Sequence, residues 1–215
     1  MNTLAEPSYR ARVGYQAGLL GGFALLAAAL LVMGDIATRD TIALREAEDL
    51  KATLTQVIPA ELHDNDLLEA TVPLVDDAGR TVTVYRALRD GTVSALAFPV
   101  VGKGYAGEIR LMLGVDPEGR ILGVRVIAHS ETPGLGDKIE LAKDDWILDF
   151  DGRALGDPPA ARWAVAKDGG DFDQFSGATI TPRAVVRAVR AGLERFAAER
   201  SRLIVAPDRL DTAEE

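Results

Sequence analysis

The sequence predicts an α+β protein, in which a single transmembrane helix precedes a domain built on a twisted, mainly antiparallel sheet packed by helices. Three observations predict this fold class. A stretch of 22 residues without a formal charge occupies residues 13–34. Short β-like runs separated by turn residues fill residues 70–130, and helical periodicity returns near the C-terminus. A chain of 215 residues has room for one domain of ordinary size beside the helix.

The uncharged stretch is long enough to cross a bilayer. At 1.5 Å per residue it makes a helix of about 33 Å, against a hydrocarbon core of about 30 Å. A cleaved secretory signal and a buried soluble helix are the alternatives, but signal cores usually run to about 7–15 residues and soluble helices normally keep a polar face. Arg10 and Arg12 precede the span, so the N-terminus, residues 1–12, should stay in the cytoplasm. The span then lies in a bacterial inner membrane, and the chain beyond Asp35 is periplasmic.

The elements after the span are expected in a fixed order. Thr41 is a good N-cap for a helix that ends near Val57, so residues 35–65 form a stalk or first packing helix. Four strands follow, at residues 81–85, 94–98, 109–113 and 121–127, joined by Asp-, Pro- and Gly-containing turns too short for helical crossovers. A helical segment at 138–148 and a last helix from Pro182 complete a domain of residues 66–205. Residues 206–215 form an acidic tail.

The composition excludes several kinds of chemistry. Lys and Arg total 24 against 33 Asp and Glu, a net charge of −9, so no cationic surface for nucleic acid is expected. The chain has no cysteine, which excludes disulfides, thiolate metal centres and a cysteine nucleophile. The two histidines, His63 and His129, match no metal-ligand spacing, and no metal is expected. Redox chemistry would therefore require a cofactor.

Small residues and hydroxyls lead into the last helix over residues 173–182, Asp-Gln-Phe-Ser-Gly-Ala-Thr-Ile-Thr-Pro. The N–H groups of a first helical turn lack intrahelical partners, so such a start can bind a phosphate or phosphodiester. The plainer alternative is that Thr179 or Thr181 only caps the helix, and spacing alone does not decide between them. A hydrolase using Ser176 or Thr179 as nucleophile is a further alternative, but neither histidine lies in a recognisable nucleophile–base motif.

This segment resembles the Asp-x-x-Ser/Thr-Gly-Ala-Thr flavinylation signature of the FMN-binding domain family. The matching positions are Asp173, Ser176, Gly177, Ala178 and Thr179. The resemblance implies that a flavin transferase esterifies the Thr179 hydroxyl with the phosphate of FMN. It also implies that residues 176–178 form the recognised loop, that Asp173 is recognised during attachment, and that Ile180 and Thr181 contact the phosphate through backbone amides. Such a tether would keep the cofactor at its site in an exported protein.

A second segment, residues 129–138, contains a turn whose glycines allow the backbone to approach a flat ring closely. Its string Glu-Thr-Pro-Gly-Leu-Gly resembles a loop found in the G subunit of Rnf electron-transport complexes and in the C subunit of sodium-pumping NADH:quinone reductase, where the loop lies against the isoalloxazine. The resemblance implies flavin contacts at Glu131, Thr132, Gly134, Leu135 and Gly136. The turn at residues 104–107, Gly-Tyr-Ala-Gly, also resembles the family but reads equally well as a simple hairpin, and is not assigned to the site.

The resemblance extends over the whole plan of the chain, and the chain length favours the Rnf G subunit over the longer C subunit, which stays the alternative. It implies a flavoprotein that relays electrons through FMN, within NADH and ferredoxin electron transfer coupled to Na⁺ or H⁺ transport, rather than a stand-alone enzyme with catalytic side chains. The implied partners are the other subunits of the complex, the flavin transferase during maturation and membrane lipid. A membrane-anchored adaptor domain without a cofactor is the alternative from another class.

Overall fold

The computed structural model of the chain describes residues 13–76 and 79–205. They fall into two units that divide between Asp49 and Leu50. The expected cytoplasmic segment 1–12 and acidic tail 206–215 lie outside the described residues. The functional site belongs entirely to the second unit, which holds the sheet.

A single long helix, α1 (Val13–Val57), replaces the expected span and separate second helix. Thr41 was expected to cap a new helix, and this was wrong: Thr41 lies inside α1. No glycine or proline follows Gly34 in this helix, and the Thr38 hydroxyl donates to the Gly34 carbonyl at 2.9 Å, so the helix continues without a break. Among the described residues, α1 is the one helix long and apolar enough to cross a membrane. A short 3₁₀ turn, η2 (Ala60–Leu62), follows it.

Five strands form one antiparallel sheet in the order of the chain. They are β1 (Thr71–Val75), β2 (Thr81–Arg89), β3 (Thr92–Lys103), β4 (Glu108–Val115) and β5 (Ile121–Ala128). The expected antiparallel sheet is confirmed, but the expected number of four strands was wrong because β1 was missed. Pro73 lies at the centre of β1, and proline is tolerated there because β1 is an edge strand of the sheet.

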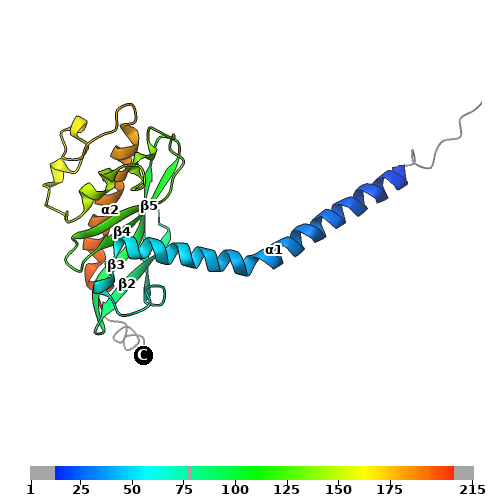
Figure 1. Ribbon diagram of the computed structural model, residues 1–215, viewed down its shortest axis with the longest axis horizontal. Helices are drawn as coiled ribbons and strands as arrows, with labels where there is room; N and C mark the ends of the chain where they lie inside the picture. Colours follow the sequence, from blue (N-terminus) through cyan, green and yellow to red (C-terminus); the bar gives the residue numbers. More distant parts are fainter. Residues whose placement is uncertain (1–12, 77–78, 206–215) are drawn as a thin grey trace, which may run out of the picture. The chain divides into compact units, whose positions relative to one another are not determined.

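Helix α2 (Ile180–Leu203) packs against one face of this sheet, and the end of α1 packs against the other (Figure 1). Successive residues of the central strand β3 belong alternately to the two cores, as the two-residue period of a strand requires. Leu96 and Phe98 join the larger core with α2, where the Phe98 and Phe196 rings stack with centroids 6.3 Å apart. Ala95 and Ala97 join the smaller core.

The smaller core depends on small residues in the sheet. A Cβ at Gly114 would lie 2.9 Å from the Cβ of Val57, and one at Gly123 would lie 3.2 Å from the Val57 Cα. The two glycines therefore let the backbone of the last turn of α1 approach the sheet closely. Leu54 and Val57 are fully buried there.

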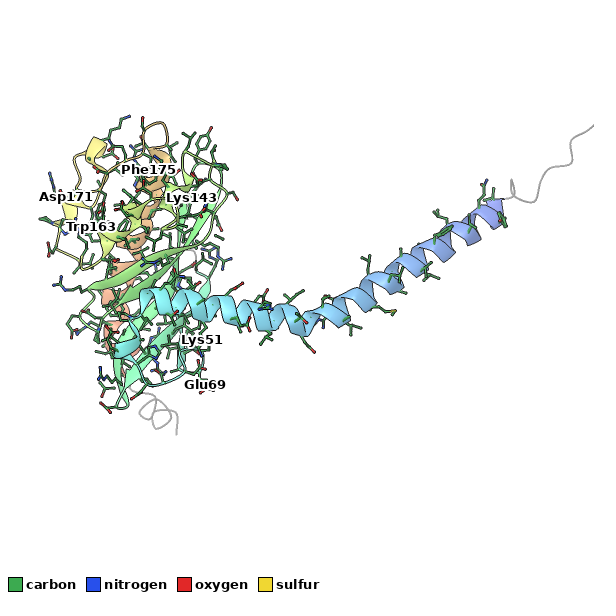
Figure 2. All side chains as sticks on the ribbon, viewed as in Figure 1. Lys51, Glu69, Lys143, Trp163, Asp171 and Phe175 are labelled. Atoms are coloured by element: carbon green, nitrogen blue, oxygen red, sulfur yellow. The ribbon has the colours of Figure 1, made fainter. Side chains whose placement is uncertain are left out.

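The chain between β5 and α2 forms short 3₁₀ turns around aromatic side chains. The turns are η3 (Asp137–Ile139), η4 (Asp145–Phe150), η5 (Ala160–Arg162) and η6 (Ala166–Asp168). The helix expected at 138–148 was wrong, because Asp144 is extended and its side chain accepts a hydrogen bond from the Trp146 N–H, which starts a new turn. Figure 2 shows Phe175, Trp163 and Lys143 at one end of the domain and Glu69 at the opposite end.

Candidate flavin site

Three segments distant in the sequence enclose one cavity of about 340 Å³, a volume within the range of about 300–1,000 Å³ that is usual for small-molecule sites. They are the turn between β3 and β4, the loop that follows β5 and the start of α2. The residues that line the cavity are Tyr105, Glu131, Thr132, Leu135, Gly136, Gly177, Ala178, Thr179, Ile180 and Thr181. The structure thus brings most members of the two sequence motifs together, although 34 residues (139–172) separate the motifs along the chain.

Three of the predicted site residues do not line the cavity. Gly134 has a positive φ of 77° and open space around its Cα, so its role is to turn the loop. Ser176 is exposed. Asp173 is also exposed, and its carbonyl accepts a hydrogen bond from the Trp146 indole N–H at 2.9 Å.

Thr179 occupies the N-cap position of α2, but its side chain makes no capping hydrogen bond. Its backbone is already helical, with φ −63° and ψ −26°, whereas a capping side chain normally requires an extended backbone. The residue is half-buried and lines the cavity. The structure therefore does not support the alternative in which Thr179 serves only as a side-chain cap of the helix.

Thr181, in the first turn of α2, makes a different interaction. Its side chain is 1% exposed and its hydroxyl donates to Oε2 of Glu131. Oε1 of Glu131 accepts from the Ala106 N–H at 3.0 Å, so both carboxylate oxygens are bonded to the protein. Glu131 itself is 5% exposed.

Polar side chains continue from the cavity loop towards the surface. Nδ1 of His129 accepts from the Glu131 N–H at 3.0 Å, and its Nε2 lies 2.7 Å from Glu140. Lys143 donates to Asp137 at 2.7 Å, which holds the pKa of the Asp137 carboxyl below its ordinary value and raises the pKa of Lys143. These contacts fix the base of the loop.

The described residues show neither a hydroxyl–histidine pair nor a cluster of metal-ligating side chains at this cavity. Within the described residues, the hydroxyls of Ser176 and Thr179 form no hydrogen bond with either histidine. No group of three or more His, Asp or Glu side chains suited to a metal occurs in residues 13–76 and 79–205. The residue types around the cavity instead combine a hydroxyl, a helix N-terminus and apolar walls.

Sequence reasoning missed two residues that shape the site. Trp146 packs edge-on against Phe175 with ring centroids 5.2 Å apart and against Phe150 at 5.4 Å, and its N–H holds the Asp173 carbonyl. No local signal could have linked Trp146 to a partner 27 residues away. Tyr105 lies in the Gly-Tyr-Ala-Gly turn, whose resemblance to the family was the available signal; it is 72% exposed at the rim of the cavity.

A larger hollow of about 580 Å³ lies between α2 and the β1–β3 side of the sheet and shares Tyr105 with the cavity above. Arg80, Lys103 and Arg195 line it, but neither threonine of α2 does. Of the segments that resemble the family, the larger hollow contains no residue of the two motifs, only the glycine-rich turn at residues 104–107, so the smaller cavity is the candidate flavin site.

The chain contains an FMN-binding domain: residues 104–194 match the family model of that description, which covers all three segments of the cavity wall. The chain belongs to the family formed by the G subunit of the ion-translocating oxidoreductase complex. It is 54% identical over 186 residues to this subunit from Cereibacter sphaeroides strain ATCC 17029, covering 86% of this chain and 85% of the relative. The corresponding Stutzerimonas stutzeri protein is 48% identical over 187 residues, covering 87% and 82%.

The predicted family is thereby confirmed, and the α+β fold with it. Among solved structures, the Shewanella oneidensis NqrC crystal structure resembles this chain with a TM-score of 0.45 and 25% identity, over 70% of this chain and 73% of that one.

Proposed function

We propose that this chain is a membrane-anchored flavoprotein subunit that relays electrons within an ion-translocating oxidoreductase complex, through FMN joined by a phosphoester to Thr179. When bound, FMN supplies the one- and two-electron chemistry that the side chains of a cysteine-free chain lack. The names of the relatives and the FMN-binding domain support the relay and its cofactor.

One observation carries the attachment at Thr179. The signature threonine stands in the wall of the cavity at the start of α2, and its hydroxyl is not used to cap the helix. The N–H groups of the first turn of α2 favour a phosphate at this position. Leu135 and Ile180 give the same cavity an apolar wall. The residues present therefore fit an FMN phosphate at Thr179 with the flavin ring in the cavity.

The remaining site residues have supporting roles in this proposal. Ser176, Gly177 and Ala178 form an exposed or half-exposed loop that a flavin transferase can reach, with Asp173 recognised beside it. Ile180 and Thr181 offer backbone amides to the phosphate. Of the predicted contacts on the loop after β5, four line the cavity and would face the ring: Glu131, Thr132, Leu135 and Gly136.

The attachment is tested by co-expressing the full chain with a flavin transferase and measuring flavin fluorescence in a denaturing gel. We expect a fluorescent band and a mass increase of FMN minus water on the peptide that contains Thr179. Thr179→Ala should lose both, whereas Thr132→Ala, which removes another hydroxyl from the same cavity, should keep them. Flavin still bound to Thr179→Ala would refute this attachment, and an unmodified protein without flavin would favour the adaptor alternative.

Membrane anchoring and orientation belong to the same proposal. Helix α1 spans the inner membrane in contact with lipid, residues 1–12 stay in the cytoplasm and the FMN-binding domain is periplasmic. Because the chain has no cysteine, single substitutions report the topology directly. A membrane-impermeant maleimide should label Glu69→Cys in intact cells but Ser8→Cys only after permeabilisation. The reverse pattern would overturn the orientation.

A further inference from the structure

We propose that Glu131 holds the three segments of the flavin cavity together and lowers the reduction potential of the flavin through its buried negative charge. The inference rests on the proposed function, because it requires a flavin in the cavity. The sequence predicts Glu131 as a flavin contact. The structure assigns it a further role, since each of its carboxylate oxygens also bonds to another segment of the protein.

The carboxylate of Glu131 joins three pieces of backbone that no continuous element connects. The Ala106 N–H in the turn between β3 and β4 donates to Oε1 at 3.0 Å, and the Thr181 hydroxyl in the first turn of α2 donates to Oε2. Glu131 belongs to the third segment, the loop after β5. Its position therefore determines how the loop and the flavin-bearing helix start lie relative to each other.

Two glycines show how tightly this carboxylate is enclosed. A Cβ at Gly136 would lie 2.8 Å from the Thr181 Oγ1 and 2.9 Å from the Glu131 Oε2. A Cβ at Gly104 would overlap Oε1 from the other side. The carboxylate is thus held between backbones that have no side chain, and it has no room to turn away. A charge fixed in this way acts on the cavity without reorganising.

The charge on Glu131 is not neutralised by a cation. The two carboxylate oxygens of Glu131 accept from a backbone N–H and a hydroxyl, which are neutral donors. None of the ion pairs found in residues 13–76 and 79–205 includes Glu131, and Lys143 on the same loop pairs with Asp137 and Glu140. The positive end of α2 stabilises the carboxylate. Because reduction adds electrons to the flavin, a fixed anion in the cavity wall disfavours the reduced form.

The test removes the charge of Glu131 and keeps the shape of its side chain. Glu131→Gln retains the side-chain size and an acceptor oxygen, so the full chain, co-expressed with flavin transferase and purified in detergent, should carry as much covalent flavin as the unmodified protein. We expect its midpoint potential, from a dithionite titration followed by flavin absorbance, to shift to a more positive value. Glu140→Gln is the matched control, because Glu140 bonds to His129 outside the cavity, and it should leave the potential unchanged. An unchanged melting temperature verifies that each variant is folded.

A second variant tests the direction in which the Glu131 charge shifts the midpoint potential. Thr181→Val keeps the Glu131 charge but removes one of its donors, so the midpoint potential should become more negative. Flavin-bearing Glu131→Gln with an unchanged or more negative potential overturns this inference alone. If Glu131→Gln does not fold, an unchanged or more positive potential in Thr181→Val overturns it. If the unmodified protein carries no flavin, the proposed function fails and this inference fails with it.

Discussion

Replacing Gly136 by alanine places one methyl group into a crowded part of the candidate flavin site. The backbone of Gly136, with φ −86° and ψ −17°, suits any residue, so the effect is steric only. The new Cβ would lie 2.8 Å from the Thr181 Oγ1, 2.9 Å from the Glu131 Oε2 and 3.0 Å from the Glu131 Cβ. All three atoms belong to buried side chains that are bonded to each other. They can make room only by separating the loop from α2.

The cost follows from the size of this overlap. Adding a methyl group to a packed interior costs about 1–3 kcal/mol. In a chain of this length each kcal/mol lowers the melting temperature by about 2–4 °C, so Gly136→Ala should melt about 2–12 °C lower. We also expect less covalent flavin, because the start of α2 that carries Thr179 moves with Thr181. Circular dichroism of the full chain in detergent measures the first effect, and fluorescence in a denaturing gel measures the second.

Gly134, two residues earlier in the same loop, is the matched control. Its φ of 77° makes alanine strained, at about 1–2 kcal/mol, but the space around its Cα is open. Gly134→Ala should therefore lose stability while keeping its flavin content. The steric reasoning would be refuted if both variants lost flavin equally, or if Gly136→Ala kept its stability and its flavin.

Three further predictions concern the surroundings of the site. Trp146→Phe removes the donor to the Asp173 carbonyl, which should cost about 1 kcal/mol and reduce flavin attachment at a fixed transferase level, as measured by melting and in-gel fluorescence. Lys143 lowers the pKa of the Asp137 carboxyl, so this pair stabilises the fold above the ordinary aspartate pKa of about 3.9 and stops doing so as the pH falls through the lowered value. The melting temperature should accordingly depend less on pH below about 4 in Asp137→Asn than in the unmodified chain. Leu54→Ala should cost about 2–5 kcal/mol in the sheet domain, because Leu54 is fully buried, and an unchanged melting temperature would exclude the last turns of α1 from that domain.

The antiparallel sheet could be predicted because its signals are local. Asp-Gly at residues 90–91 joins β2 and β3, and Asp90 takes the positive φ of 51° that this kind of turn requires. The errors arose where an interaction overrode a local pattern. The side chain of Asp144 bonds to the Trp146 N–H and starts a new 3₁₀ turn, although the residues around it resemble a helix. Strand β1 was missed because Pro73 disfavours a strand locally, and the strand forms through its pairing with β2.

The identity of the residues that line the cavity could be predicted better than the interaction that each of them makes. The two motifs supplied all but one of the residues that line the cavity, since each motif is continuous in the sequence. The bond between Thr181 and Glu131 joins residues 50 positions apart, and no periodicity or spacing encodes it. The family resemblance implies that Glu131 contacts the flavin, and only the fold shows that it also links two other segments of the cavity wall.

The two threonines at the start of α2 make different interactions, and this difference supports the proposed attachment at Thr179 rather than at Thr181. The Thr181 hydroxyl is buried and bonded to Glu131, so it cannot take a phosphate without leaving that carboxylate unpaired. Thr179 lines the cavity, and its hydroxyl lacks the capping bond that usually stabilises a helix by about 1 kcal/mol. A local rule broken in this way is expected where function requires the group to be free. Thr179→Ala should therefore remain without flavin even though a second hydroxyl lies two residues away.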